Sequence, residues 1–174
     1  MLPEETLIIK DRAFRNCTGL TCVRIPAKVS KLSGGAFEGC DGIERFEVAE
    51  GSPCFKAADG VLMSADGKQL VCFPPARGGE YTVPGGVEWI GSAFAWGSAQ
   101  LKVTVRNGKV NTEWNAFRTD GTLVADCPKG SPLYETLRKR RGPLVENSEL
   151  KEEKKSAVGG LLKKLFGNLW CLAP

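Results

Sequence analysis

Cysteines are the residues of this chain with the widest chemical range, because the sequence holds seven of them and no histidine. A thiolate can act as a nucleophile, ligate zinc or form a disulfide. The absence of histidine excludes Ser-His-Asp and Cys-His catalysis as well as histidine-ligated metals. The cysteines are Cys17, Cys22, Cys40, Cys54, Cys72, Cys127 and Cys171. An odd number without a CxxC pair argues against both a zinc site and a disulfide framework.

The other candidates for chemistry are the carboxylates Asp11 and Glu38 and the lone thiol of Cys72. None lies at a spacing that pairs an acid with a base or a nucleophile with its activator. Cys17 and Cys40 stand 23 residues apart in similar surroundings, which indicates small buried apolar residues rather than ligands. We therefore predict a protein that is not an enzyme and has no catalytic residues, no cofactor and no metal.

The 23-residue spacing of these two cysteines is part of an internal repeat. The equivalent positions are Ala13-Phe14 with Ala36-Phe37, Leu20 with Ile43, Val23 with Phe46, Ile25 with Val48 and, further on, Ala93-Phe94 with Ala116-Phe117. A fixed period in the twenties predicts a solenoid, in which each repeat forms one coil that buries its apolar residues against its neighbours. Solenoids mostly present surfaces, so the repeat favours recognition over catalysis.

Each repeat is expected to end in a short, half-buried strand. Val23 and Ile25 alternate with Cys22 and Arg24, so the first two should face inward and the second two outward. Pro26 should then end the strand, because proline has no N–H to donate to a neighbouring strand.

Residues 49–80 interrupt the period and predict an inserted hairpin. Gly60–Ser64 and Gln69–Phe73 are apolar runs, and the turn Ala65–Lys68 between them contains Asp-Gly. Asp-Gly between two apolar runs strongly favours a tight hairpin. The coils are expected to resume after the insertion, over residues 81–127.

The repeat unit A-F-x-x-C-x-x-L-x-x-V-x-I-P and the hairpin G-V-L-x-S-x-D-G-K-x-L-V-x-x-P together resemble the BspA-like leucine-rich repeats, which are common in bacterial surface proteins. The restart V-P-x-x-V-x-x-I-G-x-x-A-F over Val83–Phe94 strengthens the resemblance. Cys127–Tyr134 is similar to the closing V-P-x-G-S-x-x-x-Y element, although Cys replaces Val and the spacing is one residue shorter. The resemblance covers residues 7–137. It implies adhesion or protein–protein recognition and supplies no catalytic residues.

The predicted fold class is therefore mainly β: a leucine-rich-repeat solenoid of 23-residue coils with an inserted hairpin and a C-terminal helical tail. Residues 1–137 are expected to form the solenoid, including a capping segment in which Ser131 begins a short helix. Residues 138–174 are expected to form a basic linker and an amphipathic helix. We interpret the run Arg138–Arg141 as a solvated linker, so no nucleic acid is expected as a partner.

The amphipathic helix is predicted from a stripe of apolar residues near the C-terminus. These are Leu161, Leu162, Leu165, Phe166, Leu169 and Trp170. Lys163 and Lys164 lie opposite them, which gives the helix a basic polar face. Three destinations stay open: an exposed end of the solenoid, an anionic membrane surface or a groove in a partner protein.

We expect a recognition module that binds a protein partner through outward residues of the stacked strands. The candidate surface comprises Arg24, Arg45, Glu47, Thr82, Lys102 and Thr104. The alternative is a membrane-peripheral scaffold anchored by the C-terminal helix. The uncapped first coil, residues 7–12, also favours homodimerisation. The acidic N-terminus lacks the apolar core of a signal peptide, which predicts a cytoplasmic chain as written, whereas the family resemblance implies the cell surface if the chain is a piece of a longer one.

Overall fold

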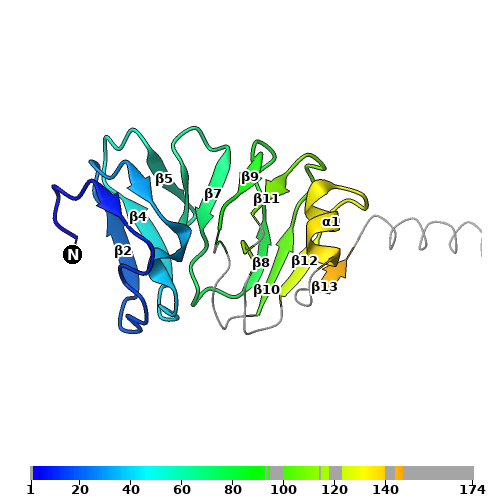
Figure 1. Cartoon of the computed structure of the whole chain (residues 1–174), viewed down its shortest axis with the longest axis horizontal. Coiled ribbons are helices and arrows are strands. Elements are labelled where there is room, and N and C mark those ends of the chain that lie inside the picture. Colours follow the sequence, from blue (N-terminus) through cyan, green and yellow to red (C-terminus); the bar gives the residue numbers. More distant parts are fainter. Residues whose placement is uncertain are drawn as a thin grey trace, which may run out of the picture.

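In the computed structural model the chain forms a row of coils whose short strands stack along the long axis of the molecule (Figure 1). The first coil lies at one end, and the one α-helix among the described residues, α1 (Pro132–Arg138), lies near the other (Figure 1). The structure describes residues 2–92, 94, 100–113, 115–117, 123–139 and 144–146.

One series of parallel strands falls into two sheets. The first sheet pairs β2 (Cys22–Ile25) with β4 (Arg45–Val48), and the second has the order β8 (Gly79–Thr82), β10 (Leu101–Thr104), β12 (Leu123–Asp126), β13 (Leu144–Glu146). Cys22 lies opposite Arg45, a step of 23 residues, whereas Leu101 lies opposite Leu123, a step of 22. The predicted coil length is therefore confirmed for the first pair and shortens by one residue in the later coils.

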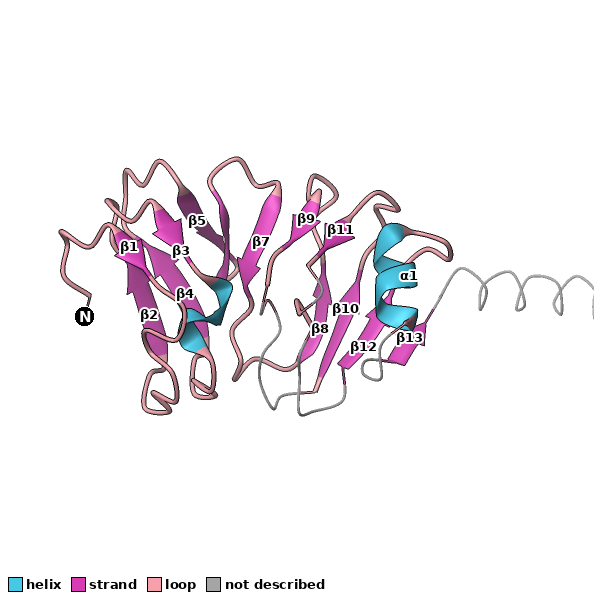
Figure 2. Ribbon diagram, in the orientation of Figure 1, coloured by secondary structure: helices cyan, strands magenta, loops and turns pink. Residues whose placement is uncertain are grey.

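A second series of strands follows the upper part of the molecule in Figure 2. β1 (Ile8–Ile9) pairs with β3 (Lys31–Leu32), and a 3-10 helix, η1 (Gly34–Phe37), follows β3. The remaining strands form one mixed sheet in the order β11 (Asn111–Thr112), β9 (Trp89–Ile90), β7 (Gln69–Cys72), β6 (Val61–Ser64), β5 (Phe55–Ala58).

The insertion contains the predicted hairpin and one further strand. β6 and β7 are antiparallel, and Gly67 lies in the turn between them with φ +77°. The Gly67 N–H donates to the Ser64 carbonyl (2.9 Å), and the Lys68 N–H donates to Asp66 Oδ1 (2.9 Å). β5 was not predicted; it pairs antiparallel with β6 and extends the hairpin to three strands.

The hairpin separates two hydrophobic clusters. The N-terminal cluster is built around Val23, Ile25, Phe37, Ile43 and Phe46. The C-terminal cluster is built around Tyr81, Ile90, Phe94, Val103 and Phe117. Side chains of β6 and β7 enter both clusters, Leu62 and Val71 the first, Met63 and Leu70 the second. A strand buried on both faces reads as a continuous apolar run, which explains the sequence of the insertion.

A short helix covers the C-terminal coils. α1 (Pro132–Arg138) is capped by Ser131, whose hydroxyl accepts a hydrogen bond from the Tyr134 N–H (3.2 Å). Leu133 and Leu137 of this helix are fully buried against the coils. Beyond it, β13 adds a parallel strand beside β12. No sequence pattern predicted this strand, which follows the boundary that we place at residue 138.

The prediction that Cys17 and Cys40 are both buried is only half correct. Cys40 is completely buried, and its thiol donates to the Phe14 carbonyl (2.8 Å). Cys17, the equivalent residue one coil earlier, is exposed. The two positions differ because no described coil packs outside the first one, so equivalence in the repeat does not bring equivalent burial.

Candidate functional site

The six residues predicted to form a partner surface all lie on the first series of strands, and none of them is buried. They fall into two groups. Arg24, Arg45 and Glu47 lie on the β2–β4 sheet, whereas Thr82, Lys102 and Thr104 lie on β8 and β10. Because β4 and β8 belong to different sheets, the structure brings the residues together within each group but not across the two.

The N-terminal group is a compact set of charges. Arg24 lies opposite Glu47 in the strand register, and Arg45 Nε lies 3.0 Å from Glu47 Oε1. The hydrogen bond from Arg45 lowers the pKa of Glu47 and raises that of Arg45. Burial, and then a hydrogen bond to Glu47, raises the pKa of the neighbouring Cys22 thiol. Cys22 therefore stays protonated at neutral pH and is a poor nucleophile.

The C-terminal group includes an acidic residue that the sequence analysis omitted. Glu80 lies opposite Lys102, and Lys102 Nζ lies 3.6 Å from Glu80 Oε1. The alternation that placed Thr82 outward also applies to Glu80, two residues earlier, so the signal was present. Each group thus carries both signs of charge, and neither creates a strong field for a charged partner.

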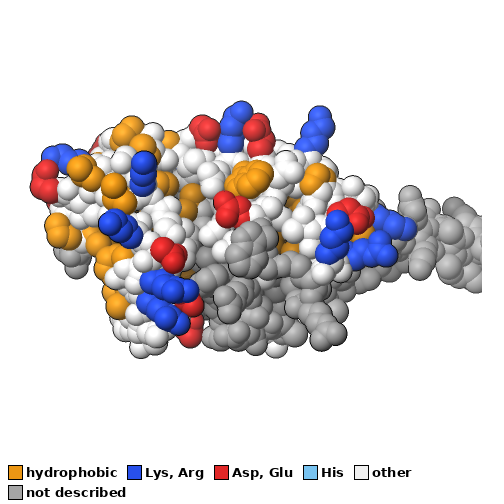
Figure 3. Space-filling model, viewed as in Figure 1, with side chains coloured by type: hydrophobic (Ala, Val, Ile, Leu, Met, Phe, Trp, Pro, Cys, Tyr) orange, Lys and Arg blue, Asp and Glu red, His pale blue; other side chains and the backbone are white. Residues whose placement is uncertain are grey.

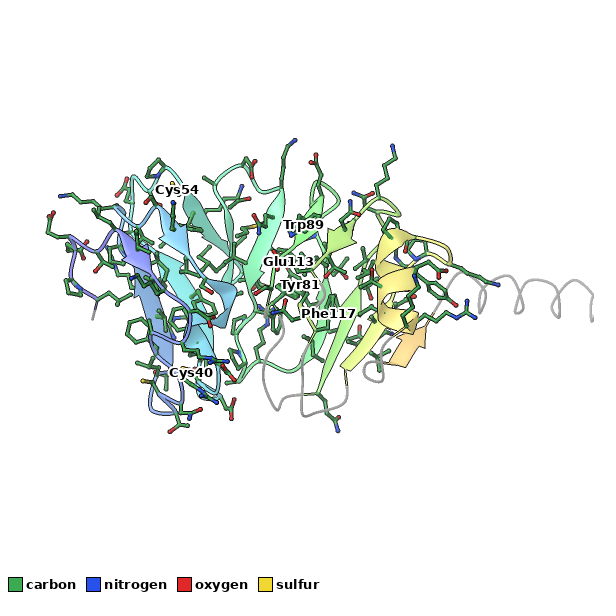
Figure 4. All side chains as sticks on the ribbon, in the orientation of Figure 1. Cys40, Cys54, Tyr81, Trp89, Glu113 and Phe117 are labelled. Carbon is green, nitrogen blue, oxygen red and sulfur yellow. The ribbon has the colours of Figure 1, made fainter. Side chains whose placement is uncertain are left out.

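A second feature lies on the β7–β9–β11 face, which the sequence analysis did not consider. Trp89 is 39% exposed, and it lies opposite Gln69 on one side and Asn111 on the other. Glu113, which follows β11, lies beside β9, because its N–H donates to the Ile90 carbonyl (3.1 Å) (Figure 4). A hollow of about 230 Å³ opens where the first coils meet this face. Its polar side chains are Ser33, Gln69, Ser92 and Glu113.

Comparison with known proteins agrees with this architecture. Residues 1–57 match the family described as a BspA type leucine rich repeat region (6 copies). The first coils of this chain are thus similar to BspA-type leucine-rich repeats. The resemblance seen in the sequence is therefore confirmed. No curated protein matches the chain.

Solved structures with similar repeats come from bacteria. A leucine rich cell surface protein of Faecalibacterium prausnitzii is 28% identical with a TM-score of 0.55, over 72% of this chain and 32% of its own. A leucine-rich repeat protein of Eubacterium ventriosum is 19% identical with a TM-score of 0.55, over 72% and 42%. The pneumococcal vaccine antigen PcpA is 22% identical with a TM-score of 0.51, over 62% and 28%. The chain therefore spans less than half the length of each of these proteins.

The buried thiols of the described coils are unreactive. Burial raises the pKa of Cys72 to about 12 and that of Cys127 to about 11. Asp11 and Glu38, the carboxylates considered for catalysis, both lie near Arg12, whose Nε is 3.7 Å from Asp11 Oδ2 and 3.1 Å from Glu38 Oε2. In the described ranges no three potential metal ligands gather. These side chains are accounted for by packing and ion pairing.

The apolar stripe of the predicted C-terminal helix lies outside the described residues, and so does Cys171. Within the described part of the chain, no helix has the length and apolar character needed to cross a membrane.

Proposed function

We propose that this BspA-type repeat unit is a non-enzymatic recognition module that binds a protein partner through the outward residues of β2, β4, β8 and β10. The observation that carries the proposal is the register of these strands. It sets Arg24 beside Glu47, and Lys102 beside Glu80, in rows along one series of strands. Such rows offer many polar contacts over an extended surface, as protein interfaces require.

The similar proteins support a role in adhesion. One of them is described as a cell surface protein and another as a vaccine antigen. Repeat units of this family thus occur in proteins that meet other molecules outside the cell. We propose the same setting for this chain, as part of an adhesive or recognition surface.

The exposed Trp89 favours a second binding face for the same function. Tryptophan is enriched among the residues that dominate binding energy at protein interfaces. Trp89 lies opposite Gln69, and Gln69 and Glu113 both line the hollow, so an apolar anchor lies near polar groups. A partner that uses this face would insert a side chain into the hollow while packing against the indole.

Site-specific photocrosslinking tests the proposal and separates the two faces. A photoreactive phenylalanine analogue is placed at Thr104, at Trp89 or at Lys109, an exposed position in the turn before β11. We expect a partner to be captured from position 104 and not from position 109. Capture from position 89 alone would assign recognition to the Trp89 face. Equal capture from all three positions would contradict a defined surface.

The partner identified in this way allows a quantitative test. With purified partner, Arg45→Ala should weaken binding about tenfold, because it removes one side chain and leaves Glu47 without its ion pair. Lys109→Ala is the matched control and should leave the dissociation constant unchanged. An unchanged dissociation constant for Arg45→Ala would contradict the proposed surface.

A further inference from the structure

The two ends of the solenoid are not equivalent. At the C-terminal end, α1 buries Leu133 and Leu137 completely. At the N-terminal end, Leu7 is 58% exposed and Ile8 is 51% exposed. These are the two most exposed large hydrophobic side chains in the described part of the chain. Figure 3 shows apolar side chains gathered toward this end of the molecule.

The open end also contains a hollow with an apolar wall. It has a volume of about 120 Å³, and its apolar lining includes Leu2, Phe14, Leu20, Val23 and Phe37. Phe14 stacks on Phe37, with ring centroids 5.5 Å apart, but stays partly exposed. By contrast, Phe94 in the C-terminal cluster is fully buried among three other aromatic rings.

The strands at this end have free edges as well. β1 pairs only with β3, and β2 pairs only with β4, among the strands that the structure describes. Their outer edges therefore present unpaired backbone groups beside exposed Ile8. An apolar, unpaired edge is an association hazard that proteins usually cover.

The chain itself carries a segment with the matching composition. Residues 161–170 hold six large apolar residues, together with Lys163 and Lys164. At the open end, Glu4 and Glu5 are exposed acidic residues. Glu5 already pairs with Lys28 at 2.7 Å, whereas Glu4 has no ion pair with any residue that the structure describes. The segment thus complements the open end in apolar surface. Its lysines have acidic neighbours there in Glu4 and Glu5, beside the exposed Lys10, Lys28 and Lys31.

The connection is also long enough for the segment to reach that end within one molecule. Fourteen residues, 147–160, separate β13 from residue 161, and an extended chain of this length spans roughly 45 Å. Four of the five steps from β2 to β13 are strand pairings of ~4.8 Å, together roughly 19 Å, which leaves roughly 25 Å of reach for the step from β4 to β8 across the insertion.

We propose that residues 161–170 fold back along the solenoid and cover the open N-terminal end in the same molecule. The segment would act as a second cap: its apolar residues would pack on Leu7, Ile8 and Phe14, and its lysines would face Glu4 and Glu5. This cap shields the free strand edges and prevents the end-to-end association that an open coil favours.

Thiol crosslinking of the full chain tests this contact. Cys17 is exposed at the open end, and Cys171 follows the proposed capping segment. Cys22 and Cys54, the other partly accessible cysteines, are replaced by serine, while Cys40, Cys72 and Cys127 are buried. A short bismaleimide should link Cys17 to Cys171 within one chain, as seen by mass spectrometry of dilute protein.

The matched control moves the thiol to the other end of the solenoid. In a Cys17→Ser background, Lys129→Cys places an exposed thiol near α1, closer in sequence to Cys171. We expect the link from position 17 to form about tenfold faster than the link from position 129. Ile8→Asp, a substitution at a half-exposed position, should abolish this preference without unfolding the chain.

Three results would overturn the proposal. If Cys171 were linked to position 129 as fast as to position 17, or faster, residues 161–170 would have no preference for the open end. Crosslinks between chains would show that a second copy covers the open end. Co-sedimentation with phosphatidylserine vesicles, combined with no Cys17 link in their absence, would assign the segment to a membrane surface.

Discussion

The repeated phenylalanine shows how one residue type depends on its coil. Phe94 is fully buried and lies within 6.3 Å of three aromatic ring centroids, whereas Phe14 is only partly buried and stacks on one ring. Phe94→Ala should therefore lower the free energy of unfolding by about 3–5 kcal/mol. Phe14→Ala, the same change at the equivalent position, should cost about half as much. Urea denaturation measures both, and equal losses would contradict the difference in packing.

Buried thiols make the protein sensitive to alkaline pH. Burial raises the pKa of Cys72 from 9.0 to about 12. The unfolded chain releases this proton near pH 9, whereas the folded chain retains it up to about pH 12. The protonated Cys72 thiol therefore contributes its full stabilisation of the folded state below pH 9. This contribution falls by ~1.4 kcal/mol per pH unit as the pH rises from 9 to 12. Cys72→Ala should lower stability at pH 7 but show a shallower decline between pH 9 and 11. An unchanged slope would contradict this assignment.

For single residues, the sequence predicts which way a side chain points better than it predicts how deeply that side chain is buried. Strand alternation correctly placed Val23 and Ile25 inward and Arg24 outward, because the period of two is a property of the backbone. The exposure of Cys17 was not predictable, since it depends on whether another coil packs outside. Trp89 was missed for a related reason: its outward position follows from the pairing of β9 with β7, which lies in the insertion.

The coils before the insertion and the coils after it form the two halves of the molecule, and they come into close contact at Gly34. Gly34 begins η1, and a Cβ at this position would overlap the backbone carbonyl of Ser92, in the coil beyond the insertion. No side chain can move to relieve this contact, because the obstacle is backbone. Gly34 therefore permits the close approach of the first coils to the later ones.

Gly34→Ala should accordingly destabilise the fold by about 1–3 kcal/mol, because the two halves must separate to admit the methyl group. Gly19→Ala is the matched control, since a Cβ at Gly19 meets nothing within 4 Å. The control should change the free energy of unfolding by less than ~0.5 kcal/mol. Thermal and urea denaturation of both variants provide the comparison. An equally small effect at Gly34 would mean that the contact between the halves is loose.

Strands and helices that have a signal in their own sequence were predictable. Strands that form only because they pair with another strand were not. β6 and β7 have apolar runs joined by Asp-Gly, and α1 has Ser131 followed by proline. β5 has the sequence FKAA, with little alternation or β propensity, and it forms because β6 offers a free edge. β13 pairs with β12 in the same way, after a run of basic residues that favours a linker. The candidate surface residues were predicted as outward, but their division into two groups depends on the insertion.

At the scale of the whole molecule, the insertion links two cores that the repeat alone would have merged into one. β6 and β7 send Leu62 and Val71 into the N-terminal cluster and Met63 and Leu70 into the C-terminal cluster. Unfolding either half would leave one face of this hairpin exposed to water. Each half therefore stabilises the other, beyond the nearest-neighbour contacts that govern a regular solenoid.

Hydrogen exchange tests this coupling directly. Phe46→Ala removes a large side chain, 2% exposed, from the N-terminal cluster and should cost about 3 kcal/mol. If the hairpin couples the cores, the amides of β10 and β12 should exchange about 100-fold faster, although Phe46 belongs to the other cluster. Val103→Ala in the C-terminal cluster should likewise accelerate exchange in β2 and β4. If each substitution affected only its own half, the hairpin would be a passive spacer, and the two stacks would unfold independently.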